Sequence, residues 1–199
     1  MVNKIIKALL FVIIVVLAYM VYDSIMEPVK FNKEVDRRNA VVIQSLKDIR
    51  NAEMSFKSIN GRYTANFDTL IDFLKTGQIP EVKIIPDPND TTFTKTIRDT
   101  IGFVPVADSL FGKRINFDIS KIKYIPFTDN KVFKLDAGVI NRGGVSVNVF
   151  EASALYKEFL AELDKQMVTN LIASKVQIDR FPGLKVGSMT EASTDGNWE

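Results

Sequence analysis

Cysteine and histidine are both absent from this chain of 199 residues. A disulfide-stapled scaffold, a thiol nucleophile, a histidine general base and a zinc site built from Cys or His ligands are therefore excluded. Neither sign of charge is in large excess, since there are 26 basic and 24 acidic side chains. That balance argues against a general nucleic-acid binder, which carries a marked basic excess. With 46% hydrophobic residues, the chain is too apolar to be disordered.

Helix-breaking residues are scarce in the first third of the chain. The first glycine is Gly61, and Pro28 is the only proline before Pro80. Apolar side chains then recur at the spacing of one helical face, at Val35, Val42, Leu46, Ile49 and Phe56. We expect a helix over residues 30–59, with Pro28 merely kinking its junction to the preceding segment, so that one nearly continuous rod runs from that segment into the domain.

A long apolar run occupies the N-terminal end of the chain. Residues 8–22 carry no polar group except the hydroxyls of Tyr19 and Tyr22. A helix over residues 5–26 is about 33 Å long, and a bilayer core is about 30 Å thick. We expect a retained single-pass anchor, and the alternative is a secretory signal cleaved near residues 16–18. A lipid anchor is excluded because there is no cysteine to acylate.

The basic residues around this run predict its orientation. Lys4 and Lys7 lie at its N-terminal side, and the positive-inside rule places them in the cytoplasm. We expect the protein in the inner (cytoplasmic) membrane, with its C-terminal domain in the periplasm. The rest of the chain then has 24 basic and 24 acidic side chains, so this domain is neutral. The expected divisions are a cytoplasmic N-terminus at 1–4, a transmembrane helix at 5–26, a long stalk helix at 27–60 and an extracytoplasmic domain at 61–199.

The remaining sequence predicts an α+β domain. A short helix is expected over residues 66–75, with Asn66 as its N-cap and Gly77 at its end. The apolar pattern predicts strands at 82–85, 100–106, 122–127, 132–140, 145–150 and 184–186. Helices are expected over 152–163 and 165–178. Short turns between strands imply antiparallel neighbours, so the expected fold has an N-terminal transmembrane helix, a long membrane-proximal helix packed on an antiparallel sheet, and C-terminal helices.

The segment at residues 52–64 carries a family resemblance. Phe56, Lys57 and the run Asn60-Gly61-Arg62-Tyr63 resemble the helix end of the major pseudopilins of type II secretion systems, with Thr64 where that family has proline. The run Gly196-Asn197-Trp198 is similar to the family's C-terminal calcium-loop region. The resemblance implies a membrane span running into a long helix, followed by a small helix and an antiparallel sheet. The chain is also similar to uncharacterised single-pass envelope proteins of Bacteroidota.

The pseudopilin processing site is missing from this sequence. It requires a glycine, a phenylalanine and a glutamate five residues into the mature chain. Here no glycine precedes Gly61 and no acidic residue precedes Asp23.

Two polar segments could hold calcium, and each has a simpler interpretation. Residues 87–90, Asp-Pro-Asn-Asp, could ligate the ion or form a solvated turn. In the tail, Glu191, Asp195 and Asn197 are weak calcium candidates, and a polar terminus without a metal is the preferred interpretation. No metal is therefore assigned.

Four residues are candidates for interaction with another protein. Phe31, Val35 and Val42 lie on the membrane-proximal half of the long helix and could contact another subunit, whereas the second half is expected to be the spine on which the sheet packs. Trp198 either docks onto the domain or contacts a partner.

Charged and polar residues on the same helix have local interpretations. Glu34 with Arg38 and Glu53 with Lys57 predict i,i+4 ion pairs on its polar faces. The run at 60–63 is either a contact surface or a helix cap followed by a chain reversal.

No catalytic motif and no cofactor-binding motif is found in the sequence. We expect a non-catalytic, membrane-anchored structural or accessory subunit of a bacterial envelope machine. The alternatives are an accessory subunit packed against an ion-driven inner-membrane motor, and a tethered enzyme or ligand-binding domain. The expected partners are the lipid bilayer and other envelope-complex subunits, including a polytopic inner-membrane protein or another copy of the chain, and no nucleic acid.

Overall fold

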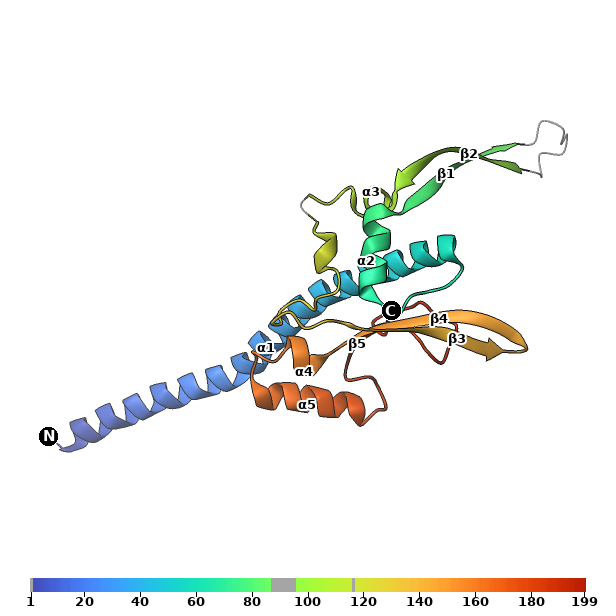
Figure 1. Ribbon diagram of the computed structural model, residues 1–199. Coiled ribbons are helices and arrows are strands. Elements are labelled where there is room, and N and C mark those ends of the chain that lie inside the picture. Colours follow the sequence, from blue (N-terminus) through green and yellow to red (C-terminus); the bar gives the residue numbers. More distant parts are fainter. Residues whose placement is uncertain (1, 87–95, 116) are drawn as a thin grey trace.

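The computed structural model describes residues 2–86, 96–115 and 117–199. Its longest element is α1 (Val2–Asn60), a helix of 59 residues that runs through Pro28 without interruption. At 1.5 Å per residue this rod is about 88 Å long. Figure 1 shows its N-terminal half standing clear of the body and its C-terminal half running into the domain. The nearly continuous rod that the sequence predicts across Pro28 is confirmed.

The chain reverses after α1 as the sequence predicts. Gly61 has a φ of 73° and donates its N–H to the carbonyl oxygen of Lys57 at 2.8 Å, which ends the helix in the left-handed conformation that glycine tolerates. The next helix, α2 (Phe67–Thr76), begins at the predicted cap, since the Asn66 side chain accepts the N–H groups of Asp68 and Thr69. Gly77 follows its last residue.

Two antiparallel sheets complete the α+β fold. The strands β1 (Gln78–Pro86) and β2 (Thr96–Pro105) form a hairpin that projects from the body in Figure 1. The second sheet has the order β3-β4-β5, made of β3 (Lys134–Arg142), β4 (Val145–Leu155) and β5 (Gly183–Gly187). Along the chain, the short elements α3 (Val106–Phe111) and η1 (Ile119–Lys121) connect β2 to β3.

The predicted helix over 152–163 is wrong except at 156–159. Residues 152–155 extend β4, where Ala152 pairs with Leu135 on one side and Val186 on the other. A central strand covered on both faces shows a continuous apolar run, which periodicity cannot distinguish from a buried helix. Only the short α4 (Tyr156–Phe159) follows it. The other C-terminal helix is confirmed as α5 (Lys165–Val176).

The predicted strand over 122–127 is also wrong. This segment follows η1 as a loop with Ile122 and Ile125 buried, and its one strand-like contact among the described residues is an isolated bridge from Tyr124 to Val132. Pro126 has no N–H to donate to a sheet. Phe127 has a φ of 62°, which is incompatible with an extended strand.

The second half of α1 is the spine of the domain. Val42, Leu46, Ile49 and Ala52 have no exposed surface, as the spacing of the apolar face predicts. Around them α1 contacts β4, β5, α2 and α3. The long helix packed on an antiparallel sheet is therefore confirmed.

Candidate functional site

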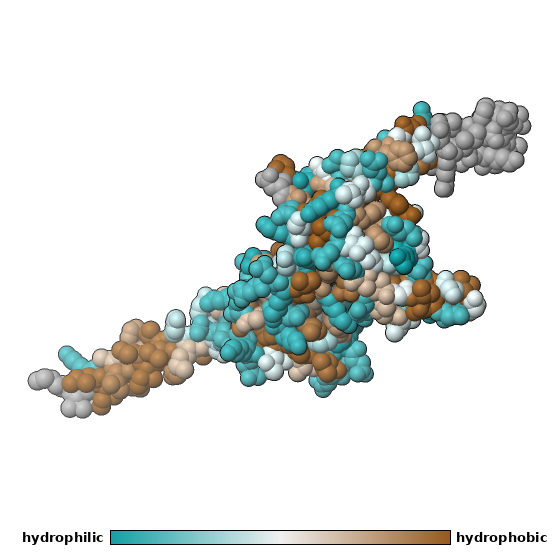
Figure 2. Space-filling model, in the orientation of Figure 1, coloured by the Kyte–Doolittle hydropathy of each residue, from teal (hydrophilic) through white to brown (hydrophobic). Residues whose placement is uncertain are grey.

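The N-terminal half of α1 is apolar and exposed along its length. None of the most apolar stretch is buried, and Figure 2 shows this segment as a continuous hydrophobic surface separate from the body. The helix is long and apolar enough to cross a bilayer. A domain-core helix would be covered by other elements, and this segment is not. The chain thus has a candidate transmembrane helix and is consistent with a single-pass membrane protein.

The structure corrects two of the three interaction residues predicted on this helix. Val35 is 7% exposed and Val42 is fully buried, so neither side chain is available to another subunit. Both belong to the buried core, and on the same helix Arg38 contacts the C-terminal part of the chain, since it donates to the carbonyl oxygen of Phe159 in α4 at 2.8 Å. Phe31 is half-buried against the same core.

Arg38 also anchors the loop that the sequence predicted as a strand. Its side chain is almost fully buried and forms ion pairs with Glu34 and Glu162, both at 2.9 Å. The first of these confirms the predicted i,i+4 pair. The guanidinium carbons of Arg37 and Arg38 lie 5.1 and 4.9 Å from the ring centroid of Phe127, within cation–π range. Phe127, the residue of the loop with a left-handed backbone conformation, therefore holds the loop against α1.

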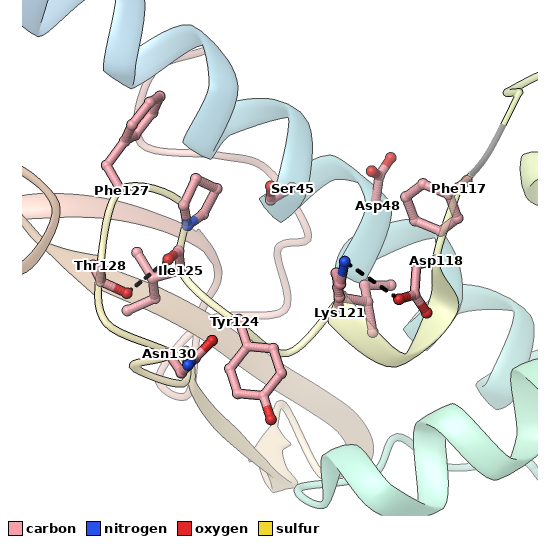
Figure 3. Close-up of a pocket in the computed structure, with 12 residues that line it drawn as sticks. Ser45, Asp48, Phe117, Asp118, Lys121, Tyr124, Ile125, Phe127, Thr128 and Asn130 are labelled. Carbon is pink, nitrogen blue, oxygen red and sulfur yellow. Dashed lines mark hydrogen bonds and ion pairs between the residues drawn. The ribbon is translucent and has the colours of Figure 1, made fainter.

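This loop and α1 enclose a cavity of about 480 Å³ (Figure 3). Ser45 and Asp48 face it from α1, and the other labelled side chains come from the segment at 117–130. Among the lining residues, the exposed side chains of Lys121 and Asp118 form an ion pair at 3.6 Å, and the Thr128 hydroxyl donates to the carbonyl oxygen of Ile125 at 2.7 Å. Some of the polar groups that line the cavity are therefore paired within the lining, and apolar side chains such as Ile122 and Ile125 form another part of its wall.

Asp48 connects this cavity to the loop after α3. The carboxylate is buried and accepts two hydrogen bonds from the Arg114 guanidinium, at 2.6 and 2.7 Å, and one from Gln44 at 3.0 Å. Arg114 in turn lies over the rings of Phe111 and Phe117, at 5.8 and 5.4 Å from their centroids. A bidentate pair with one buried carboxylate fixes geometry as well as charge. The sequence analysis missed this pair because it joins residues 66 positions apart.

Glu53 is a second buried acid, and the prediction that it pairs with Lys57 on a polar face is wrong. The side chain has no exposed surface, and its Oε2 accepts the N–H of Thr64 at 3.0 Å. Its Oε1 is buried without a hydrogen-bond partner among the described residues. Lys57 instead lies 4.6 Å from the ring centroid of Tyr63. The sequence itself indicates that Glu53 is buried. It is four residues after Ile49 and three before Phe56, which places it on the apolar face of the helix.

Burial raises the pKa of Glu53 from 4.5 to about 7, against the opposing effect of the Thr64 N–H. The folded state therefore holds the proton more tightly than the unfolded chain. By linkage, the free energy of unfolding falls as pH rises from about 4.5 to about 7 and stays low above that range. The difference corresponds to about 3 kcal/mol.

Glu53→Gln should remove this pH dependence and make the domain more stable than the parent protein at pH 8. Urea unfolding at pH 5 and pH 8 measures it. Glu34→Gln on the same helix is the control. Arg37 and Arg38 lower the pKa of Glu34 to about 2, so Glu34 changes the free energy of unfolding only between about pH 4.5 and 2. If Glu53→Gln retains the parent's fall in stability between pH 5 and 8, burial of a protonated Glu53 is disproved.

The run at 60–63 forms the cap and chain reversal, the second of its two interpretations. Tyr63 is almost fully buried and its ring centroid lies 4.7 Å from that of Phe150 in β4. Together with the bond from Thr64 to Glu53, this packing ties the end of α1 to the sheet.

The C-terminal tail docks on the domain. Gly196 forms a bridge with Val186 of β5, and the Asn197 side chain accepts the N–H of Lys185 at 3.1 Å and donates to the carbonyl oxygen of Gly183 at 3.0 Å. Arg50 of α1 pairs with Glu199 at 2.9 Å. Trp198 packs against the core, which is the docking alternative of the two considered for it.

The calcium candidates of the tail are not gathered into a ligand set. Asn197 uses its amide in the two bonds to β5, and Asp195 accepts the Ser193 hydroxyl at 3.0 Å. Within residues 2–86, 96–115 and 117–199, no group of three acidic side chains converges as a metal site would require. The other candidate, at residues 87–90, lies outside the described residues.

No protein-family model, no curated protein and no solved structure matches this chain. The resemblance to pseudopilins therefore depends on the residues of the 52–64 segment and on the order of the elements.

Proposed function

We propose that this chain is a non-catalytic, membrane-anchored structural or accessory subunit of a bacterial envelope assembly. One observation carries the proposal: a single helix is an exposed apolar rod over its first half and the buried spine of a domain over its second. A movement of the membrane-embedded half of this helix would then move the domain directly, because no flexible linker separates the two. The proposal includes the inner membrane as location, a cytoplasmic N-terminus and a periplasmic domain.

The projecting hairpin offers a contact surface for a partner. Phe103 and Ile101 on β2 are 65% and 57% exposed, and Val82 on β1 is 41% exposed. Large apolar side chains on a projecting arm are typical of interaction surfaces. An arm of two strands also leaves backbone groups at its outer edges that can pair with another chain.

Pseudopilin-like architecture is part of this proposal, with a permanent anchor in place of processing and polymerisation. The alternative, an accessory of an ion-driven motor, is compatible with the same anchor. No acidic or basic side chain lies between Lys7 and Asp23, so the span would pack against a channel and not conduct protons itself.

A photo-crosslinking residue at Phe103 should capture an envelope or integral-membrane protein that also copurifies with the full chain in mild detergent. The control is the same residue at Ile178, which is 59% exposed but lies after α5. We expect at least fivefold more crosslinked product from position 103. Recovery of a lone monomer with equal, scattered crosslinking at both positions would contradict the proposal.

A further inference from the structure

A second cavity, of about 330 Å³, lies on the domain apart from the one in Figure 3. Five segments meet there: α1, α4, α5 with the connection after it, β5 and the docked C-terminal tail. Its size is at the lower end of small-molecule sites, which span about 300–1,000 Å³. A ligand of one or two rings would fit such a space.

Two polar atoms of the lining are buried without a hydrogen-bond partner among the described residues: Oδ1 of Asn39 and Nε1 of Trp198. Unpaired buried polar atoms are rare in proteins, and each is unfavourable until a partner arrives. Here one atom is an acceptor and the other a donor. A ligand that carries hydroxyl groups can satisfy them, since a hydroxyl accepts from an indole N–H or donates to an amide oxygen.

Aromatic side chains form much of the remaining wall. Tyr156 is buried, and Phe181 and Trp198 are partly exposed to the cavity side. Burial raises the pKa of Tyr156, so its hydroxyl stays protonated and the wall stays neutral. Flat apolar faces of this kind pack well against the C–H face of a sugar ring.

The other lining side chains give the cavity a positive charge. Lys175, Arg180 and Lys185 all contribute to it. Lys185 is neutralised in part by Glu151 at 3.1 Å. In the part of the chain that the structure describes, no ion pair involves Lys175 or Arg180, so two cations are available to an anion.

We propose that this cavity binds a small anionic sugar, carboxylated or phosphorylated. Its ring packs on the aromatic wall, its hydroxyl groups pair with Trp198 and Asn39, and its anionic group pairs with Lys175 and Arg180. Gly196 of the docked tail packs directly on the indole, since a Cβ there would lie 2.3 Å from the Trp198 ring. This close contact holds the indole in place. This binding function is separate from the anchored-subunit role.

Trp198 is the one tryptophan in the sequence, so its fluorescence reports on this cavity directly. The full chain is titrated in a detergent without a sugar head group, using glucuronate, glucose 6-phosphate, glucose and inorganic phosphate as probes. We expect a saturable emission change with glucuronate or glucose 6-phosphate. Glucose and inorganic phosphate should each bind at least tenfold more weakly.

The double variant Lys175→Gln with Arg180→Gln should weaken binding of the anionic sugar at least tenfold. Lys165→Gln, an exposed cation at the start of the same helix, is the matched control and should bind as the parent does. Asn39→Leu should abolish binding and raise the melting temperature by about 2–4 °C, because it removes a buried acceptor with no partner.

Three results would overturn the proposal. These are the absence of any saturable change with both anionic sugars, equally tight binding of inorganic phosphate or of glucose, and unchanged binding in the double variant. If Asn39→Leu destabilises the fold and no sugar binds, the two polar atoms hold a structural water only. Each measurement is independent of membrane partners, so failure here leaves the anchored-subunit proposal standing.

Discussion

Arginine at both Val12 and Val15 should strongly reduce membrane insertion. Each arginine near the centre of a span costs about 2.5–3.5 kcal/mol, or about 5–7 for the pair. The remaining Leu, Ile, Val and Phe residues of the 5–26 segment contribute about 3–7 kcal/mol in the opposite direction. Insertion then becomes unfavourable or marginal. Carbonate extraction of membranes measures the effect, and the parent protein should stay in the pellet while the variant moves to the supernatant.

Val29→Arg is the matched control for this experiment. Val29 is also an exposed residue of α1, at 53%, but it lies beyond the apolar segment. Its replacement should leave the protein in the pellet. Intact-mass measurement of the parent protein separates the anchor from a cleaved signal. A mature chain that begins after residue 18 would contradict the retained anchor.

Leu46→Ala should lower the free energy of unfolding by about 2–5 kcal/mol. Leu46 has no exposed surface and lies in the centre of the helix face that the sheet covers. Its truncation leaves a cavity among side chains that belong to separate elements and cannot collapse together. Domains are stable by about 5–15 kcal/mol in total, so much of that stability should be lost. Urea unfolding of the detergent-solubilised full chain measures the change.

Met54→Ala controls for the loss of side-chain bulk from the same helix. Met54 is 49% exposed, and its replacement should change stability by at most about 0.5 kcal/mol. Similar effects of the two substitutions would mean that α1 is an independent stalk and not the spine of the domain.

The sequence alone predicted those elements whose pattern is local. The run without glycine before Gly61 predicted the helix, and its apolar face at positions 42, 46 and 49 is the buried face of α1. Asn66 capped α2 as its side-chain chemistry predicts. Such features depend on neighbours within a few residues along the chain, and the amino-acid order determines them directly.

The errors fall where tertiary packing overrides local pattern. The end of β4 was mistaken for a helix because its residues are covered on both faces, which removes the alternation that marks a strand. The apolar residues around Phe127 predict a strand, but apolar content does not reveal that the backbone of Phe127 takes a left-handed conformation. The sequence predicts Val35 and Val42 as possible contacts for a partner because it does not show that the folded domain buries them in its core.

The candidate sites cannot be predicted from the sequence for the same reason. Asn39 and Trp198 are 159 positions apart in the sequence, and only the folded chain brings them to one cavity. The same holds for the pair of Asp48 with Arg114. The sequence by itself determined the apolar rod, the balanced charge of the domain and the α+β class, because these follow from composition and short-range periodicity. Tertiary structure alone decided which acids are buried, which faces are covered and where cavities form, since each depends on residues distant in the chain packing side by side.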